Sequence, residues 1–281
     1  MTVSPSARHH PDMIHDHRPA SLLRTGDPAP VVVRNGDAVA PVLVVADHAG
    51  HAVPEALGSL GLPERELWRH IAWDVGALDL ATGLADQLGA TMVASAYSRL
   101  VIDCNRYPAD PMSIAPASDG YDVPGNAGVD VIQRERRVQE IFRPYHDAIA
   151  HALEGKIARG AAPLLLAVHT MTPRLGGRDR PQHVAVCWAL DDRLPTRALA
   201  ALGRQNGLVV GDNDPYAVDI GVDYTVPEHA LRRGLPYLML EVRQDLVGTA
   251  ADVVAWVERL LPVVRDVLAD PECMAPRRIW P

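Results

Sequence analysis

The chain has 281 residues, a formal net charge of −8, 48% hydrophobic residues and only 5% aromatic residues. Its length allows one α/β domain with a large aliphatic core. The chain has no concentrated block of Lys and Arg that would mark a nucleic-acid-binding surface, and no apolar run long enough to cross a membrane. Its three cysteines are widely spaced, which argues against a disulfide framework and against a thiolate zinc site.

The first 25 residues differ in character from the rest of the chain. Residues 1–25 are predicted to form a polar arm, and residues 26–281 a single α/β domain. The polar start lacks the apolar core of a signal peptide, so we expect a cytoplasmic protein.

Strands and helices alternate along the domain. In chain order, the predicted elements are strands at 31–34 and 41–46, helices at 64–71 and 78–88, strands at 91–96 and 100–103, a long loop at 107–128, a helix at 131–154, strands at 164–168 and 183–189, a helix at 196–206, strands at 207–210 and 236–241, and a helix at 250–268. This alternation predicts a mostly parallel sheet with helices on both faces. Functional groups of such sheets gather at the carboxyl ends of the strands.

Four predicted strands end in polar side chains that can carry chemistry. The strands end, in turn, in Asp47 and His48, in Asp103, Asn105 and Arg106, in His169, and in Glu241 and Arg243. If these strands are parallel neighbours, their polar ends share one edge of the sheet and face a common crevice.

These residues first indicate a zinc-binding site. His48 and His169 would present two imidazoles from the ends of rigid strands, an arrangement that suits Zn²⁺. A catalytic zinc usually has three protein ligands, and either Asp74 or His51 can supply the third. We favour Asp74, although it can instead be the N-cap of the helix that follows.

A general base and carboxylate-binding groups are also expected. Glu241 follows three apolar residues, so burial should raise the pKa of its carboxyl toward that of a general base, unless it pairs with Arg243 on the same strand face. Arg99 and Arg106 flank Asp103. Their guanidinium groups can bind a substrate carboxylate or form salt bridges with Asp103.

Several segments together resemble the N-formylglutamate amidohydrolase family. The matching segments, in the family's order, are 47–54, 73–77, 98–106, 168–170, 211–216 and 241–243. The family is distantly similar to zinc carboxypeptidases and aspartoacylase-type deacylases, so the resemblance implies a three-layer α/β/α sandwich around a mixed sheet. It also implies that Asn105 and Arg106 bind the substrate and that Glu241 is the general base. Those relatives bind zinc through His-x-x-Glu and a later His, whereas here His51 occupies the glutamate position.

The resulting hypothesis is a zinc-dependent amidohydrolase that acts on an N-formyl or N-acyl amino acid such as N-formylglutamate, releasing the free amino acid and formate. One Zn²⁺ per chain would be held by His48, Asp74 and His169. Glu241 and Arg99 would be catalytic, and Asn105, Arg106 and Arg243 would bind a small substrate that carries carboxylates.

Two other functions remain open. One is a zinc amidase for a different small N-acyl or cyclic amide. The other is a non-catalytic ligand-binding protein on the same scaffold, which the departure at His51 supports. Neither nucleic acid nor a membrane is an expected partner, and the sequence does not decide the oligomeric state.

Overall fold

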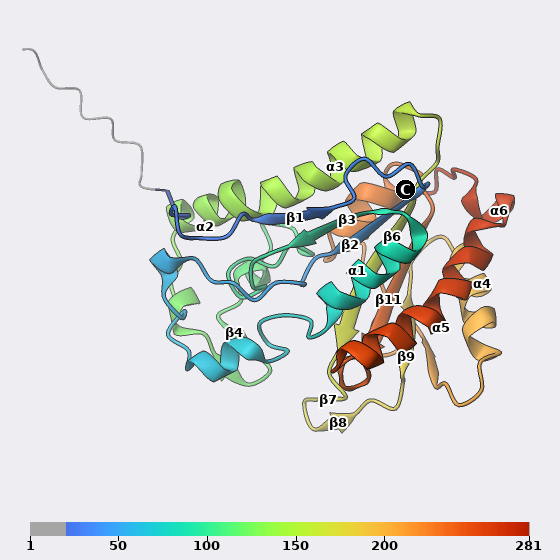
Figure 1. Cartoon of the computed structure of the whole chain (residues 1–281). Coiled ribbons are helices and arrows are strands. Elements are labelled where there is room, and N and C mark those ends of the chain that lie inside the picture. Colours follow the sequence, from blue (N-terminus) through green and yellow to red (C-terminus); the bar gives the residue numbers. More distant parts are fainter. Residues whose placement is uncertain (1–20, 281) are drawn as a thin grey trace, which may run out of the picture.

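A seven-stranded sheet forms the middle layer of the computed structural model, which describes residues 21–280 (Figure 1). The strands, in spatial order, are β1 (Val31–Arg34), β3 (Thr91–Ser95), β2 (Val42–Ala46), β6 (Leu164–Met171), β11 (Tyr237–Arg243), β9 (Val184–Cys187) and β10 (Val210–Asp212). The four strands β3, β2, β6 and β11 run parallel, and β1, β9 and β10 run in the opposite direction. The predicted mixed, mostly parallel sheet is confirmed.

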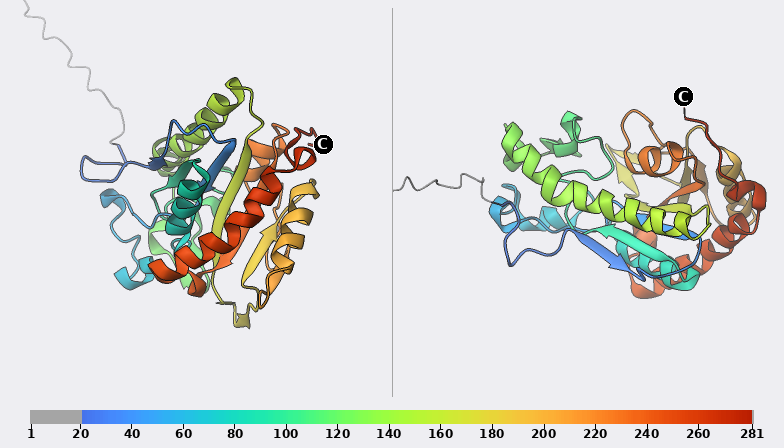
Figure 2. Two further views of the ribbon diagram at one scale, coloured as in Figure 1. Left: turned by 45° about the vertical axis from the view of Figure 1, so that its right-hand side comes forward. Right: turned by 90° about the horizontal axis from the view of Figure 1, so that it is seen from above.

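Helices cover both faces of the sheet (Figure 2). One face carries α1 (Ala77–Leu88), α4 (Arg193–Gly203) and α5 (Ala250–Leu268), and short α6 (Pro271–Met274) packs against α5. The other face carries α3 (Arg143–Ala158), which continues α2 (Val131–Arg137) through a π-helical segment, Val138–Phe142. The predicted three-layer α/β/α sandwich is therefore confirmed.

The central strands are buried because apolar side chains cover both of their faces. In β2, Leu43 and Val45 pack into the cluster on the α3 side, while Val42 and Val44 pack into the cluster on the α1 and α5 side. Successive side chains of a strand point to opposite faces, so a strand covered by helices on both sides needs apolar residues at every position. The same holds for β6 and β11 over most of their length.

Two small hairpins lie outside the main sheet, beyond the carboxyl ends of its parallel strands. The first, β4 (Ala117–Ser118) and β5 (Tyr121–Asp122), belongs to the predicted long loop at 107–128. The second, β7 (Arg174–Leu175) and β8 (Arg178–Asp179), follows β6 directly and lies at the lower end of the molecule in Figure 1.

The predicted strand at 100–103 is wrong. Val101 and Ile102 are buried, but they belong to a turn whose backbone bonds to loops. The Val101 amide donates to the Ser98 carbonyl, and the Asp103 amide donates to the Ser113 carbonyl. An apolar run of this length is typical of a buried strand. Here it does not pair in the sheet, and its Val101 carbonyl instead accepts a hydrogen bond from Arg137 of α2.

Other element boundaries also differ from the prediction. The helix predicted at 64–71 is a short 3₁₀ helix, Glu64–Trp68, and the helix predicted at 131–154 extends to Ala158. The helix predicted at 196–206 begins earlier, at Arg193, and the strand predicted at 207–210 instead begins at Val210.

Most of the predicted polar arm, residues 1–20, lies outside the described residues. Its last residues pack on the domain: Leu22 is buried, and the Leu22 and Leu23 amides donate to the Glu140 carboxylate. Among residues 21–280, no helix combines the length and the apolar character needed to cross a membrane.

A buried arginine of α2 provides a first prediction. The Arg137 guanidinium donates to the Val101 carbonyl at 2.8 Å and to the Asn126 side-chain oxygen at 2.7 Å, and Arg137 is almost inaccessible to solvent. Arg137→Met leaves both buried acceptors without a donor, so we expect the free energy of unfolding to fall by about 2 to 4 kcal/mol. Chemical denaturation measures this change. Arg143→Met, at the exposed first residue of α3, is the control, and an equal effect of both substitutions would contradict the assignment.

Candidate active site

Three neighbouring parallel strands deliver polar side chains to one face of the sheet. Along β2, the alternation that places Leu43 and Val45 on the α3 side continues to Asp47, just after the strand. The same alternation brings His169 of β6 and Glu241 of β11 to this face, and these two residues are partners in the strand register. The sheet therefore fixes the relative positions of Asp47, His169 and Glu241.

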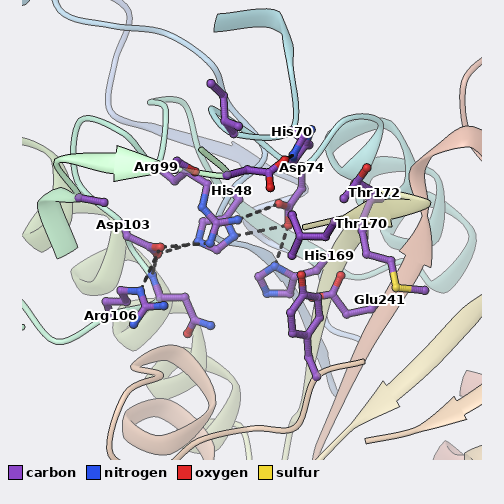
Figure 3. Close-up of a pocket in the computed structure, with 18 of the residues that line it drawn as sticks. His48, His70, Asp74, Arg99, Asp103, Arg106, His169, Thr170, Thr172 and Glu241 are labelled. Carbon is purple, nitrogen blue, oxygen red and sulfur yellow. Dashed lines mark hydrogen bonds and ion pairs between the residues drawn. The ribbon is translucent and has the colours of Figure 1, made fainter. Parts of the chain in front are cut away.

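Two more residues join this group from turns. His48 follows Asp47 directly, and the backbone amide of Asp74 donates to the His48 carbonyl at 2.9 Å. This bond ties the turn after β2 to the turn before α1. In Figure 3, His48, Asp74 and His169 point toward one another inside the pocket.

His48, Asp74 and His169 form a buried group that can hold a metal ion, and their potential ligand atoms all lie within 4.8 Å of one another. Asp74 Oδ2 lies 2.9 Å from His169 Nδ1 and 3.4 Å from His48 Nδ1. His48 Nδ1 has no hydrogen-bond partner among the described residues. Two imidazole nitrogens and one carboxylate oxygen are a donor set that transition-metal ions accept.

Two further carboxylates orient the histidines from behind. Asp103 Oδ1 lies 2.7 Å from His48 Nε2, and Asp47 Oδ2 lies 3.2 Å from His169 Nε2. Each histidine thus has a carboxylate on the ring nitrogen that faces away from Asp74, an arrangement that commonly fixes metal-binding histidines. Sequence reasoning missed these roles of Asp47 and Asp103, although both stand beside the predicted site residues.

Hydrogen bonds from the surrounding layers fix Asp47 in turn. Tyr145 of α3 and Thr225 donate to Asp47 Oδ1, both at 2.7 Å. Burial raises the pKa of Asp47, but the hydrogen bond and charge of His169 oppose it and hold that pKa at about 2. Burial likewise lowers the pKa of His169, but Asp47 and Asp74 outweigh burial and raise it well above the ordinary value. The site therefore favours positive charge at its centre.

His51 does not join the group. Its ring packs against Trp68 and Trp73, with centroid distances of 4.2 and 4.9 Å. Of the two residues considered for the third ligand, the structure brings Asp74 to the histidines. The N-cap alternative for Asp74 does not apply, because α1 begins after Gly76 without a side-chain cap.

Glu241 lies next to this group with its carboxylate buried. Its Oε2 atom has no hydrogen-bond partner among the described residues. Burial, with a smaller contribution from Asp74, raises the pKa of Glu241 to about 7. No ion pair joins it to Arg243 within the described part of the chain, so this carboxylate is available to exchange protons near neutral pH.

The pocket in front of these residues has a volume of about 480 Å³, and Arg99, Asn105 and Arg106 line it. Arg99 contacts Asp74 Oδ1 at 3.3 Å and Asp103 Oδ2 at 3.2 Å. Arg106 Nε lies 3.6 Å from Asp103 Oδ2. Both arginines therefore form the salt bridges with Asp103 that the sequence predicted as an alternative to substrate binding.

The Asn105 side chain holds the segment 223–225 in place beside the pocket. Its side-chain oxygen accepts the backbone amides of Tyr224 and Thr225, and its Nδ2 donates to Asp223 at 3.3 Å. This leaves only part of the Nδ2 group for a ligand. Asp223 itself lines the pocket, and burial raises the pKa of its carboxyl to about 6.

The structure places Arg243 outside the pocket lining. Its guanidinium donates to Asp245 and to the Arg180 and Pro181 carbonyls. The expectation that Arg243 binds substrate stays a prediction, and the donors of Arg243 are used by partners outside the pocket lining. Sequence reasoning missed Arg180, which does line the pocket, because no strand pattern marks its position between two short segments.

Comparisons with known proteins identify the family that the sequence resembles. The sequence profile of the family described as N-formylglutamate amidohydrolase matches residues 40–247. An N-formylglutamate deformylase of Pseudomonas putida is 30% identical over 124 residues, which cover 41% of this chain and 45% of that protein. The match therefore spans less than half the length of this curated relative.

Two solved structures are similar over most of the chain. A gene product of Agrobacterium tumefaciens has a TM-score of 0.85 and 33% identity, covering 88% of this chain and 98% of its own. An N-formylglutamate amidohydrolase from Ralstonia eutropha JMP134 has a TM-score of 0.58 and 22% identity, covering 85% of this chain and 99% of its own. The second likeness shows a shared fold.

The carboxylate of Asp47, which lies behind His169, allows a test of the candidate metal site. Asp47→Asn removes the charge that orients His169, so we expect affinity for Zn²⁺ to fall about 10- to 100-fold. Competition with a chromophoric chelator measures the affinity, and circular dichroism checks the fold. Asp79→Asn, at an exposed position of α1, is the control. Unchanged affinity in Asp47→Asn would contradict the orienting role.

Proposed function

The chain belongs to the N-formylglutamate amidohydrolase family, and on this premise we propose that it is a zinc-dependent hydrolase. It would cleave the amide bond of an N-formyl or N-acyl amino acid such as N-formylglutamate, releasing the amino acid and formate or another acid. One observation carries the proposal: a buried His48–Asp74–His169 group lies beside Glu241 in a pocket lined by arginines. The expected cytoplasmic location stays a prediction.

His48, Asp74 and His169 fit a single zinc ion. The unpartnered His48 Nδ1 and the Asp74 oxygen shared by both rings support this choice, as do the carboxylates that hold the opposite ring nitrogens. Zinc, when bound, supplies a Lewis acid that makes water more acidic and polarises a carbonyl oxygen. Arg99 contacts the other Asp74 oxygen, so it holds this carboxylate in place.

Glu241 acts as general base and then as general acid. A water molecule adds to the amide carbonyl carbon while the Glu241 carboxylate accepts its proton. Glu241 then donates that proton to the nitrogen of the breaking C–N bond, so the amine leaves and the acid remains. A pKa of about 7 suits both transfers, because neither protonation state is strongly favoured at neutral pH.

The arginines on the Asp103 side give the reason to expect a carboxylate in the substrate. Arg106 is only partly engaged, with long contacts to Asp103 and to Asp110 at 3.4 Å. We assign it, with the remaining Asn105 donor, to the α-carboxylate of the amino acid. Arg99, besides holding Asp74, would stabilise negative charge that develops on the carbonyl oxygen.

Two other functions stay distinguishable. A zinc amidase for another small N-acyl or cyclic amide would share the site and differ in substrate, so a panel of such amides separates the two. A non-catalytic ligand-binding protein was supported by the departure at His51. The position of Asp74 beside the histidines supports the enzyme instead.

Replacing the proposed base tests the mechanism. Glu241→Gln keeps the shape of the side chain but cannot accept the proton, so we expect kcat to fall about 10²- to 10⁴-fold with zinc content unchanged. Steady-state kinetics and elemental analysis measure the two quantities. Glu258→Gln, at an exposed position of α5, should behave like the unmodified protein. Unchanged turnover in Glu241→Gln would end the assignment.

Metal removal tests the cofactor. Protein purified without chelators should contain one zinc per chain, lose hydrolysis of N-formylglutamate after chelation and dialysis, and regain it when zinc is added. Ligand binding without stoichiometric metal and without turnover would favour the non-catalytic function.

A further inference from the structure

Three arginines line the pocket, and they differ in their partners. Arg99 pairs with Asp74 and Asp103, and Arg106 pairs with Asp103 and Asp110. Arg180 lines the same pocket and is only 9% exposed, yet no carboxylate of residues 21–280 forms an ion pair with it. A guanidinium so withdrawn from water needs negative charge or further acceptors nearby.

The known contacts of Arg180 use only part of its hydrogen-bonding capacity. One terminal nitrogen donates to the Thr172 carbonyl at 3.4 Å, and the other donates to the Tyr216 hydroxyl. A guanidinium has five N–H donors in a planar fork that matches a carboxylate. The donors left over make this group suitable for a bidentate carboxylate that arrives with a ligand.

Arg180 and Arg106 lie on different sides of the metal-binding group. In Figure 3, Asp103 and Arg106 lie on one side of His48 and His169, whereas Thr172 and Glu241 lie on the other. The bond to Thr172 places Arg180 on the Thr172 side. A ligand with one carboxylate at Arg106 therefore meets a second positive group across the pocket.

The segment 211–216, one of those that match the family, packs against Arg180 through Tyr216. The Arg180 guanidinium stacks over the Tyr216 ring at 4.7 Å. Gln182, two residues after Arg180, donates to the Asp214 carboxylate. This hydrogen bond joins the segment that carries Arg180 to the segment that carries Tyr216. Gly211 lies in β10, just before the turn, and a Cβ atom there would lie 1.9 Å from the Asp214 carbonyl oxygen, so this position requires glycine. The turn thus holds Tyr216 against Arg180.

Arg243 supports the same site from outside the pocket. One of its terminal nitrogens donates to the Arg180 carbonyl at 3.1 Å and to the Pro181 carbonyl at 3.4 Å. Its other donors reach Asp245. Arg243 is therefore a positioning residue for the backbone that carries Arg180.

We propose that Arg180 and Tyr216 form a subsite for a second carboxylate of the substrate, the side-chain carboxylate of an acidic amino acid. This inference rests on the proposed amide hydrolysis, in which Arg106 binds the α-carboxylate. Arg180 then determines specificity: it favours acidic N-formyl amino acids over neutral ones, and it takes no part in breaking the bond.

The experiment compares zinc-loaded protein and variants on two nearly isosteric substrates, N-formyl-L-glutamate and N-formyl-L-glutamine. The unmodified protein should prefer the glutamate compound. Arg180→Gln should lower kcat/KM for N-formyl-L-glutamate about 10- to 100-fold, mainly through KM, and change it little for N-formyl-L-glutamine. The preference between the two substrates is therefore the decisive quantity. Arg178→Gln, at an exposed position of β8, is the matched control.

Some outcomes would overturn the subsite. An equal loss on both substrates would show a structural role for Arg180, and no loss on either would show no role. A third substrate, N-succinyl-L-glutamine, carries its extra carboxylate on the acyl side. If the loss in Arg180→Gln falls on this compound instead of on N-formyl-L-glutamate, the subsite serves the acyl group and the proposal fails.

Two additions keep the test decisive. If Arg180→Gln does not fold, Arg243→Gln and Tyr216→Phe should reduce the same preference by smaller factors, and an unchanged preference in both overturns the proposal. If no substrate is hydrolysed, the proposed function fails separately. Calorimetric titration then decides the subsite, since Arg180→Gln must weaken binding of glutarate more than binding of butyrate.

Discussion

The structure depends on one electrostatic arrangement, in which two buried histidines stand between carboxylates. Asp74 Oδ2 faces the Nδ1 atoms of both rings, and Asp47 and Asp103 face the Nε2 atoms. Buried carboxylates are costly without positive charge, so the fold surrounds them with donors: Tyr145 and Thr225 on Asp47, Arg99 on Asp74 and Asp103. Each donor comes from a different part of the chain, so the cluster joins the helical layer, the sheet and the loops. The chemistry proposed for Glu241 takes place at the edge of this cluster.

Much of the fold and part of the site were predictable from sequence, for identifiable reasons. The apolar runs at 41–46, 164–168 and 236–241 predict buried strands, which the structure contains, and strand alternation fixes which of their polar ends share a face. His169 and Glu241 follow directly from that pattern, whereas His48 was found from its place just after a strand and lies in the turn that follows β2. The third metal-binding residue does not, because Asp74 reaches the group through a backbone bond to His48 between segments that no local pattern connects. Its role as a ligand stays a prediction.

The differences between prediction and structure share one physical cause, which is that local composition does not reveal long-range partners. The run 100–103 has the apolar character of a strand, but Arg137 and the loop at 107–128 provide its partners in place of the sheet. Arg243 lies on the same strand face as Glu241, as predicted. Glu241 lines the pocket, whereas Arg243, two residues further along the strand, lies outside the pocket lining. Its donors meet the backbone of Arg180, and that arginine faces the pocket instead.

The β7–β8 hairpin stands apart from the seven-stranded sheet, while the histidines and Glu241 stand on the sheet or directly after it. Insertions, deletions and exchanges accumulate most readily in such outlying hairpins. Evolution can therefore remodel the hairpin that directly precedes Arg180 while the proposed metal-binding residues stay in place. Descendants of one ancestral hydrolase can thus diverge in the compounds they accept, and a shared set of proposed metal-binding residues alone does not indicate a shared substrate.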